Sequence, residues 1–432
     1  MISKYINTRA ILAEHDAICQ SLSSQSCSSL VWYDLMSKLK IKMSPEFDVV
    51  IIGAGVAGLA FANALKNSPL KVLLLERKPK LMDVNRGDTL YPHSLDILEK
   101  WGVKQNLINN GAIKSQKISL VNTEKIIADL DIISSSRAGT HEMLSLQHEL
   151  IEKSLFDGLL GSQNITLVQG ANVHEFVEED GQFSLEYKHD SQDIKIKSRL
   201  FVAADGRDSL CRTSARIAYP SIDFDHNIVI LDSTLPANYN RQNWFLYGKD
   251  YKLIIGPLPG DKVRVSIIVS KDETMKWMQM SAEEATQIIR AQSLFFSQCV
   301  ITKSQSHLYE LRSCLAEKFN EKNLVLIGDS AHTVHPISGQ GMSLAISDAD
   351  SLATLLLQDT KSDFSSVAQK YSESRVLVIS SLQNEVNNLG SMLMSEDSIV
   401  KLARLFMIST LNESIEFEER IEKVLQAEIE KF

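Results

Sequence analysis

The chain has 432 residues, of which 44% are hydrophobic and 23% charged, the balance of an ordinary globular protein with two or three structural units. A net charge of -9 argues against nucleic-acid binding, because contacts with phosphates require a basic surface. No unbroken apolar run approaches the roughly 18 residues of a membrane-spanning helix. The five cysteines form no C-x-x-C pair, which disfavours disulfides and a metal site and fits a reducing compartment. We therefore expect a metal-free cytoplasmic protein that binds no nucleic acid.

Residues 1–42 differ in composition from the rest of the chain, since they are rich in serine and contain no glycine. A second methionine, Met43, stands a few residues before the first convincing strand. We interpret the segment as an extension ahead of a start at Met43. Two alternatives stay open: an organelle transit segment, which the acidic residues disfavour, and a helix packed on the body of the protein.

The next part of the sequence predicts a βαβ unit. An apolar, β-branched run at 47–52 is typical of a buried parallel strand, and a second strand is expected at 71–76. Between them lies the motif Gly53-x-Gly55-x-x-Gly58, followed by helix-forming residues. In this context Gly53 allows a tight turn, Gly55 lets backbone N–H groups approach a pyrophosphate, and Gly58 lets the helix pack closely on the strand. The helix N-terminus adds partial positive charge.

An acidic residue completes this fingerprint. Glu76 ends the second strand, close to the offset of about 20 residues at which a carboxylate binds ribose hydroxyls, and Arg77 follows it. The unit therefore predicts dinucleotide binding. The local motif does not decide between FAD and NAD.

Further elements follow from apolar periodicity and turn residues. Helices are expected at 92–101, 147–160 and 283–295 and from about 380 onward, and strands of the nucleotide fold at 165–168, 173–177, 183–187, 200–204 and 324–327. A different pattern, with short strands separated by turn residues such as those at 256–261, predicts an antiparallel sheet from strands at 228–231, 244–247, 251–255 and 263–269.

Three segments in order resemble the flavoprotein aromatic hydroxylases of the para-hydroxybenzoate hydroxylase type, over roughly residues 48–375. The first is the nucleotide fingerprint with its Glu-Arg pair. The second is the D-G segment at 203–209 with Arg212, which that family associates with both flavin and pyridine nucleotide. The third, at 328–343, is similar to the family's G-D motif and has the H-P-x-x-G-Q-G wording typical of ubiquinone-biosynthesis hydroxylases. The resemblance implies that the dinucleotide is FAD.

The resemblance also implies an architecture. It is an α/β protein with a Rossmann-type FAD-binding fold, an inserted antiparallel-sheet substrate domain and a helical C-terminus. The expected divisions are an N-terminal extension at 1–42, the FAD-binding domain at 43–219 and 316–379, the substrate-binding sheet at 220–315, and C-terminal helices at 380–432.

The G-D segment supplies most of the expected flavin contacts. Asp329 follows a strand and would accept hydrogen bonds from the ribityl hydroxyls, although a helix cap is its structural alternative. Pro336 stiffens the loop where a flat ring would lie. Gly339 and Gly341, with Met342 beside them, leave backbone N–H groups open at a helix start, where they would stabilise negative charge on the reduced ring.

Other positions carry over from the family with less weight. Arg86 resembles an arginine that touches FAD phosphate or ribityl groups, Gln147 stands where the family has Arg or Gln against the flavin, and the backbone of Val173 would meet the adenine. Asp205 belongs to the D-G segment. The family usually carries Asn where this chain has Ser343. A surface ion pair, a helix cap and core packing are the structural alternatives for Arg86, Gln147 and Val173.

No catalytic acid or base is assigned from the sequence. His335, next to the expected ring position, is a candidate for a substrate contact, and a structural role is its alternative. His332 is expected to take part in hydrogen bonding within the loop, and Tyr371 with Arg375 matches a structural Y-x-x-x-R of the family. No Ser lies in a G-x-S-x-G elbow, so a nucleophile triad is not supported.

The resemblance implies a monooxygenase that uses NADH or NADPH and O2 to hydroxylate an aromatic, phenolic or quinone-like small molecule through a flavin C4a-hydroperoxide. Strands from 220 to 310 would form one wall of the substrate cavity, with Trp244, Phe245 and Tyr247 either lining it or packing in a core. An FAD-dependent epoxidase or a prenyl or alkene reductase of the same fold is the alternative, and a flavin-binding protein without turnover is a third hypothesis. Apolar residues bunched at 402–408 leave a homodimer or a peripheral membrane contact open, with core packing as the default.

Overall fold

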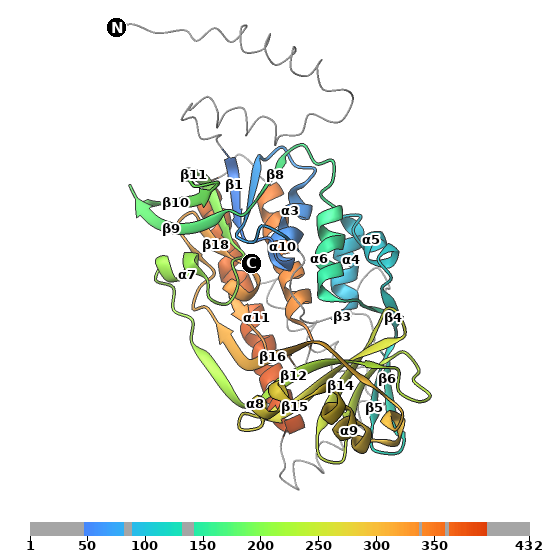
Figure 1. Ribbon diagram of the computed structural model, residues 1–432. Helices are drawn as coiled ribbons and strands as arrows, with labels where there is room; N and C mark the ends of the chain where they lie inside the picture. The colour runs from blue at the N-terminus through green and yellow to red at the C-terminus, as the bar shows by residue number, and fades with distance from the viewer. Residues whose placement is uncertain (1–46, 82–88, 132–141, 337–338, 359–362, 395–432) are drawn as a thin grey trace, which may run out of the picture. The chain divides into compact units, whose positions relative to one another are not determined.

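The computed structural model describes residues 47–81, 89–131, 142–336, 339–358 and 363–394 (Figure 1). These belong to one compact unit that starts at Glu46. The predictions for residues 1–42, for Arg86 and for the apolar group at 402–408 lie outside the described residues.

A mainly parallel sheet forms the first part of the fold. Its strand order is β17-β18-β11-β1-β2-β8, and all neighbours are parallel except β17 with β18. The bounds are β1 (Phe47–Ile52), β2 (Val72–Glu76), β8 (Ile165–Gln169), β11 (Gln192–Ala203), β17 (Asn320–Glu321) and β18 (Leu324–Leu326). The antiparallel hairpin β9 (Asn172–Glu179) and β10 (Gln182–His189) continues from β11. The predicted strands of the nucleotide fold are therefore confirmed, with β9 and β10 somewhat longer than expected and β11, expected at 200–204, beginning already at Gln192.

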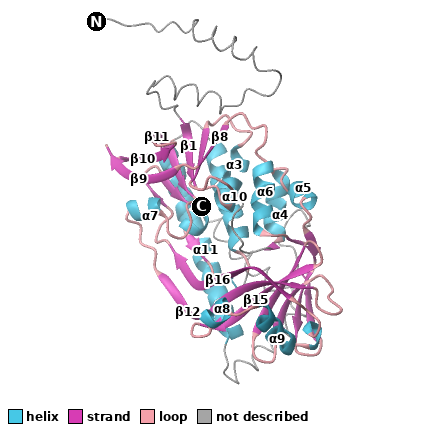
Figure 2. Cartoon of the chain, viewed as in Figure 1, coloured by secondary structure: helices cyan, strands magenta, loops and turns pink. Residues whose placement is uncertain are grey.

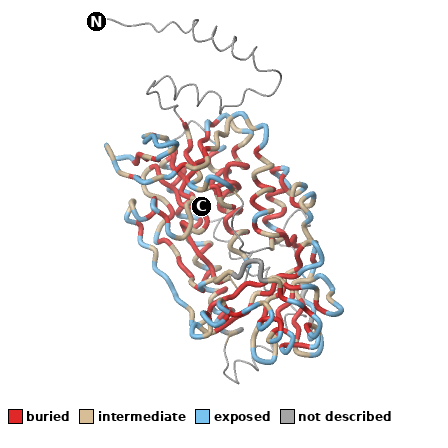
Figure 3. The backbone as a smooth tube through the Cα atoms, in the orientation of Figure 1, coloured by how far each residue is buried: buried red, intermediate tan, exposed pale blue. Residues whose placement is uncertain are grey.

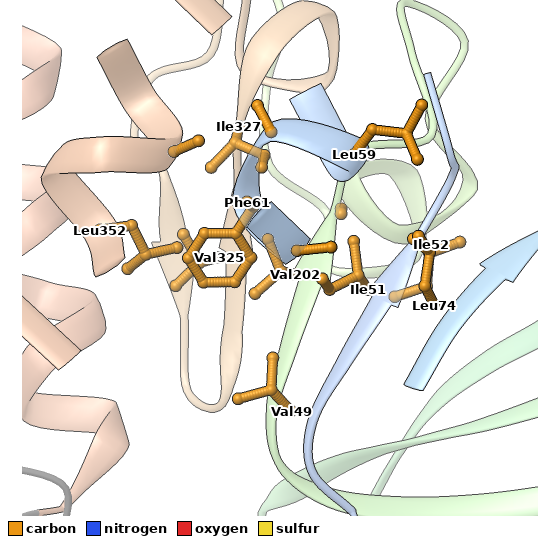
Figure 4. Packing of buried hydrophobic residues seen from close by; sticks show 14 of the residues in the cluster. Val49, Ile51, Ile52, Leu59, Phe61, Leu74, Val202, Val325, Ile327 and Leu352 are labelled. Atoms are coloured by element: carbon orange, nitrogen blue, oxygen red, sulfur yellow. The ribbon is translucent and has the colours of Figure 1, made fainter. Parts of the chain in front are cut away.

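Apolar burial explains why this sheet forms where the sequence predicts it. Val49, Val50 and Ile51 of β1 are completely buried, and each such side chain contributes roughly 1.5–3 kcal/mol through burial. Helices α3 (Val56–Leu65) and α10 (Gly341–Gln358) pack against each other beside the sheet. Figure 4 shows Phe61 of α3 and Leu352 of α10 in one cluster with residues of β1, β11 and β18.

A second sheet has the order β19-β16-β12-β15-β14-β13-β5-β6. The bounds are β5 (Lys117–Val121), β6 (Ile126–Asp131), β12 (Ser221–Thr234), β13 (Asn243–Tyr247), β14 (Lys252–Leu258), β15 (Lys262–Ser270), β16 (Ile301–Leu315) and β19 (His332–Thr333). All neighbours are antiparallel except β13 with β5. The predicted antiparallel sheet is therefore present, with one parallel pair.

Two details of this sheet differ from the sequence-based expectation. Strand β14 continues through Pro257 and Leu258, which were expected in a turn. Proline is tolerated there because Pro257 lies beyond the last residue that pairs with β13, so only its β15 side is bonded. In addition, β5 and β6 precede residue 220 yet belong to this sheet, so the expected range of 220–315 was too narrow.

The remaining described elements connect and cover the two sheets (Figure 2). A small three-stranded sheet has the order β3-β7-β4, with β3 (Thr89–Leu90), β4 (Ile113–Ser115) and β7 (Met143–Ser145). The helices are α4 (Pro92–Lys100), α5 (Lys104–Asn109), α6 (His148–Asp157), α7 (Leu210–Ser214), α8 (Thr274–Gln279), α9 (Ala282–Gln292) and α11 (Phe364–Met394), with short 3-10 turns η1 (Leu294–Phe296) and η2 (Gly328–Ser330).

Helix α11 links both sheets and runs without a break across the expected boundary at residue 380. It packs on β17 and β18 of the first sheet and on β16 of the second. Gln383 donates hydrogen bonds to the carbonyls of Cys314 and Thr333, and Lys252 of β14 donates to the carbonyl of Met394 at the last described turn. Within the described part of the chain, every helix is too short or too polar to span a bilayer.

Candidate functional site

The glycine motif forms a corner between β1, β11 and α3. Gly53 has φ +100°, and a Cβ there would lie 2.3 Å from the carbonyl oxygen of Ala204. A Cβ on Gly58 would lie 1.9 Å from the carbonyl oxygen of Gly53, so only glycine allows this approach of helix to strand. Gly55 is the N-cap of α3, and its Cβ direction is open except for Glu152 at 3.9 Å. This is the geometry that the dinucleotide fingerprint requires.

The G-D segment meets this corner directly. Gly328 has φ +60°, and a Cβ on it would lie 2.8 Å from the Cβ of Ala57 and 3.4 Å from that of Ala345. The turn that carries Asp329 therefore contacts the first turn of α3. Two motifs separated by more than 250 residues in the chain thus line one edge of the parallel sheet, where cofactors of doubly wound folds bind.

Glu76 is held at the same edge. Its Oε2 accepts a hydrogen bond from the backbone N–H of Ala54 at 2.7 Å, and its Oε1 accepts one from Lys78 N at 2.8 Å. The carboxylate therefore lies against the glycine corner, where the fingerprint places a carboxylate that binds the ribose hydroxyls. The neighbouring Arg77 is exposed, and Val173 in β9 is half-buried and packs against the core.

Two acceptors at this edge are buried without a hydrogen-bond partner. Gln147 is the N-cap of α6, as expected, and its Oε1 is one of them. Asp205 Oδ1 is the other, while its Oδ2 accepts from Cys211 N at 3.2 Å. Burial raises the pKa of Asp205. Buried polar atoms are rarely left unsatisfied, so both positions fit a bound polar group such as FAD.

Arg212 joins the D-G segment to the G-D turn. Its guanidinium donates to the carbonyls of Ser330 and Arg207 at 2.9 and 2.8 Å and stacks 3.7 Å from the ring centre of Tyr219. The hydroxyl of Tyr219 in turn donates to the carbonyl of Asp329. The second and third family segments therefore form one bonded unit.

A buried acid in α10 binds the backbone of the G-D turn at Gly328. Asp348 of α10 is fully buried, and it accepts hydrogen bonds from Gly328 N at 2.9 Å and Arg375 Nε at 2.6 Å, with His332 Nε2 at 2.7 Å. Burial alone would raise the pKa of Asp348, but His332 and Arg375 outweigh it and lower the pKa to about 2. His332 thus takes part in hydrogen bonding that holds the loop, and Arg375 has a structural role, as expected for each.

The loop after His335 approaches α4. Gly339 has φ +62°, and a Cβ there would lie 3.4 Å from the hydroxyl of Tyr91, while α10 begins at Gly341. Ser343 lies 3.1 Å from the hydroxyl of Ser94 and 3.4 Å from Tyr91 N. The serine that replaces the family's asparagine therefore bonds to the start of α4. Pro336 in the same loop and Met342 in the first turn of α10 are half-buried.

Sequence reasoning missed Asp348, Tyr91 and Tyr219. The available signal for Asp348 was its spacing of four residues from both Leu344 and Leu352, which puts an acid on the apolar face of the helix, where a buried carboxylate needs partners. Burial raises the pKa of Tyr91 to about 12, consistent with a neutral phenol beside the loop. No local pattern marked either tyrosine, because each acts through a residue far away in the sequence.

His335, within the G-D segment, contacts the second sheet. Its ring centre is 4.3 Å from that of Phe224 in β12, and a Cβ on Gly390 of α11 would touch it. Burial, with a smaller effect of His226, lowers the pKa of His335 to about 4. The imidazole is therefore neutral at pH 7.

This burial predicts a pH-dependent stability. Between about pH 6.5 and 4 the unfolded chain binds a proton at His335 that the folded protein does not, so unfolding free energy falls as pH falls, by up to roughly 1.4 kcal/mol per pH unit. His335→Gln should flatten this slope in urea unfolding series, whereas His174→Gln at an exposed position should leave it unchanged. Equal slopes in wild type and His335→Gln would contradict the assignment.

The second sheet separates the three candidate cavity residues. Trp244 packs with α8 and α9 residues in the cluster on one face, next to Phe295, so of the two possibilities left open for it the structure shows core packing. Phe245 belongs to the cluster on the opposite face, with Tyr247 packed against it. Phe224, which contacts His335, packs on that same face, so Phe245 and Tyr247 lie on the side of the G-D loop.

The fold and this edge define the class of a dinucleotide-dependent flavoprotein. Residues 46–385 match the family model described as "FAD binding domain". The chain therefore belongs to the FAD-binding domain family and is an FAD-dependent oxidoreductase, and its resemblance to the aromatic hydroxylases is confirmed.

Curated relatives carry related names. The chain is 25% identical over 379 residues to ubiquinone hydroxylase UbiM of Neisseria meningitidis, which covers 84% of this chain and 80% of that protein. It is 24% identical over 326 residues to para-nitrophenol 4-monooxygenase of a Pseudomonas species, covering 72% and 77%. The solved p-nitrophenol 4-monooxygenase PnpA of Pseudomonas putida superposes with a TM-score of 0.75 at 18% identity, over 89% of this chain and 98% of that one.

Proposed function

We propose that the protein hydroxylates an uncharged aromatic or quinone-like small molecule with O2 and NADH or NADPH. Bound FAD supplies the redox and oxygen chemistry, and the protein supplies binding, orientation and electrostatics. The observation that carries the proposal is the contact between Ala57 and Gly328, which joins the phosphate-binding corner to the loop expected under the flavin ring.

The residues of that edge divide into three tasks. The backbone of Gly53 to Gly58 and the α3 N-terminus would hold the pyrophosphate, and Glu76 the ribose. Asp329 and the amide of Gln147 would bind the polar chain between phosphate and ring. The N–H groups between Gly339 and the start of α10 would stabilise negative charge on the reduced ring, since a helix N-terminus favours anions.

The face of the second sheet toward the G-D loop supports an apolar substrate. Its buried cluster consists of Leu120, Ile228, Ile230, Phe245, Ile268 and Leu311. Two cations near this sheet are already engaged: Arg264 pairs with Asp232 at 3.0 Å, and Lys252 bonds the end of α11. Such a wall would exclude water and favour an uncharged ring. The names of the ubiquinone and nitrophenol relatives agree with that substrate class.

Substrate-stimulated oxidation of NADH or NADPH tests the proposal. Purified FAD-loaded protein is incubated with phenols, quinolones and prenylated quinone precursors, and product mass is measured. We expect one compound to raise nicotinamide oxidation and to gain one oxygen atom. A product that gains two hydrogens without O2 consumption would indicate the alkene reductase, and a flavin never reduced by NADH or NADPH would indicate binding without turnover. An epoxide from an alkene substrate would also replace the proposed hydroxylation.

Localisation and assembly remain proposals of the same kind. The cysteine pattern favours the cytoplasm, and the described Cys211, Cys299 and Cys314 are buried thiols. Homodimer formation and a peripheral membrane contact were inferred from residues beyond 394, and gel filtration and vesicle flotation of the full chain would test them.

A further inference from the structure

A buried carboxylate faces the middle glycine of the phosphate-binding corner. Glu152, in the second turn of α6, is 6% exposed, and its Oε1 lies 3.9 Å from the position that a Cβ on Gly55 would take. Helix α6 packs against α3, so the carboxylate comes from a neighbouring helix and not from the glycine motif itself (Figures 1 and 3).

Glu152 lies on the side of Gly55 from which a pyrophosphate would approach. The second glycine of the fingerprint lacks a side chain so that a pyrophosphate can approach the backbone. The N-terminus of α3, with Gly55 as its N-cap, carries the equivalent of about half a positive charge. The helix dipole therefore stabilises the carboxylate of Glu152, and the same dipole would stabilise the diphosphate of FAD.

His148 holds the carboxylate in place. Its Nε2 lies 3.3 Å from Glu152 Oε1, one helical turn away, and His148 is 7% exposed. Burying a carboxylate without such a neighbour costs several kcal/mol, so the contact makes the arrangement tenable. Burial and the contact with His148 therefore fix the position of the Glu152 side chain.

We propose that Glu152 is a placeholder anion: it stabilises the phosphate-binding corner in the FAD-free protein and opposes the diphosphate of FAD when the cofactor binds. Two negative charges near one helix N-terminus repel each other, so the affinity for FAD is lower than the same phosphate-binding corner would have without the charge of Glu152. The inference concerns FAD binding, which family membership establishes, and holds whether or not the substrate is an aromatic ring.

Glu152→Gln tests the proposal because it keeps the shape and removes the charge. We expect the FAD-free variant to melt at a lower temperature than wild type and to bind FAD about three- to tenfold more tightly, the range that removal of one like charge near a helix terminus gives. ADP, which carries the diphosphate without the flavin, should show the same gain in competition titrations.

Two further variants complete the test. Glu149→Gln removes the same charge from an exposed position in the first turn of α6 and should change FAD affinity less than twofold. Glu152→Asp keeps the charge but retracts it by one methylene, so its FAD affinity should lie between those of wild type and Glu152→Gln. A purely structural role predicts that Glu152→Gln weakens both stability and FAD binding. Unchanged or weaker binding of FAD and ADP by that variant would overturn the proposal.

Discussion

Replacing Asp348 with alanine should lower the free energy of unfolding by about 3–5 kcal/mol, because it leaves Arg375 buried without its counter-charge. The change also removes the acceptor of Gly328 N and the neighbour of His332 Nε2. Because the pKa of Asp348 is lowered to about 2, its stabilising contribution is present above about pH 4 and is lost as pH falls toward 2. Urea unfolding at neutral pH measures the effect.

The matched control is Asp350→Ala on the same helix. Asp350 pairs with Lys100 at 2.9 Å, but the lysine side chain is 61% exposed, so its loss should cost no more than about 1 kcal/mol. Comparable losses in the two variants would show that the buried network does not hold the G-D turn. FAD affinity should fall in Asp348→Ala and stay near wild type in Asp350→Ala.

Replacing Gly58 with alanine should have the second large effect. The added Cβ would lie 1.9 Å from the carbonyl oxygen of Gly53, so α3 must move away from the corner. Overpacking of this kind costs about 1–3 kcal/mol. The same displacement misplaces the backbone donors, and at 1.4 kcal/mol per factor of ten FAD binding should weaken about ten- to hundredfold. Fluorescence titration of the FAD-free variant measures this.

Gly181→Ala is the control for a glycine substitution away from the site. Gly181 has φ +80° in the β9–β10 turn, and its Cβ direction is open. Backbone strain should cost roughly 1–2 kcal/mol there, without a change in FAD affinity. Wild-type FAD binding by Gly58→Ala would show that the close packing at the corner is not needed for the cofactor.

The parts of the site that local chemistry dictates could be predicted from the sequence. The glycine corner and the carboxylate of Glu76 lie within one βαβ unit, so spacing alone locates them. That the glycine corner and the G-D segment hold one flavin was expected only from the family resemblance, and the contact of Ala57 with Gly328 could not be located from the sequence, since it depends on how β18 pairs with β11. Asp348 was missed for the same reason: its partners come from three separate elements.

The second sheet shows a different limit. Residues 244–247 are all apolar or aromatic, so the alternation that tells one face of a strand from the other is absent, and the sequence left both cavity lining and core packing open for Trp244. Strands β5 and β6 joined the sheet through a parallel pairing with β13, a partner more than 100 residues away. Hydrophobic periodicity and residue propensity indicate that a segment is a strand, but they do not predict which strand it pairs with.

A structure of the protein with FAD is the most direct test of the account. We expect the diphosphate within hydrogen-bonding distance of the backbone between Gly53 and Gly58, and the ring system against the loop between Gly339 and Gly341, in one extended molecule that passes the Ala57–Gly328 contact. FAD bound elsewhere, or with its ring and diphosphate exchanged between these two loops, would contradict it.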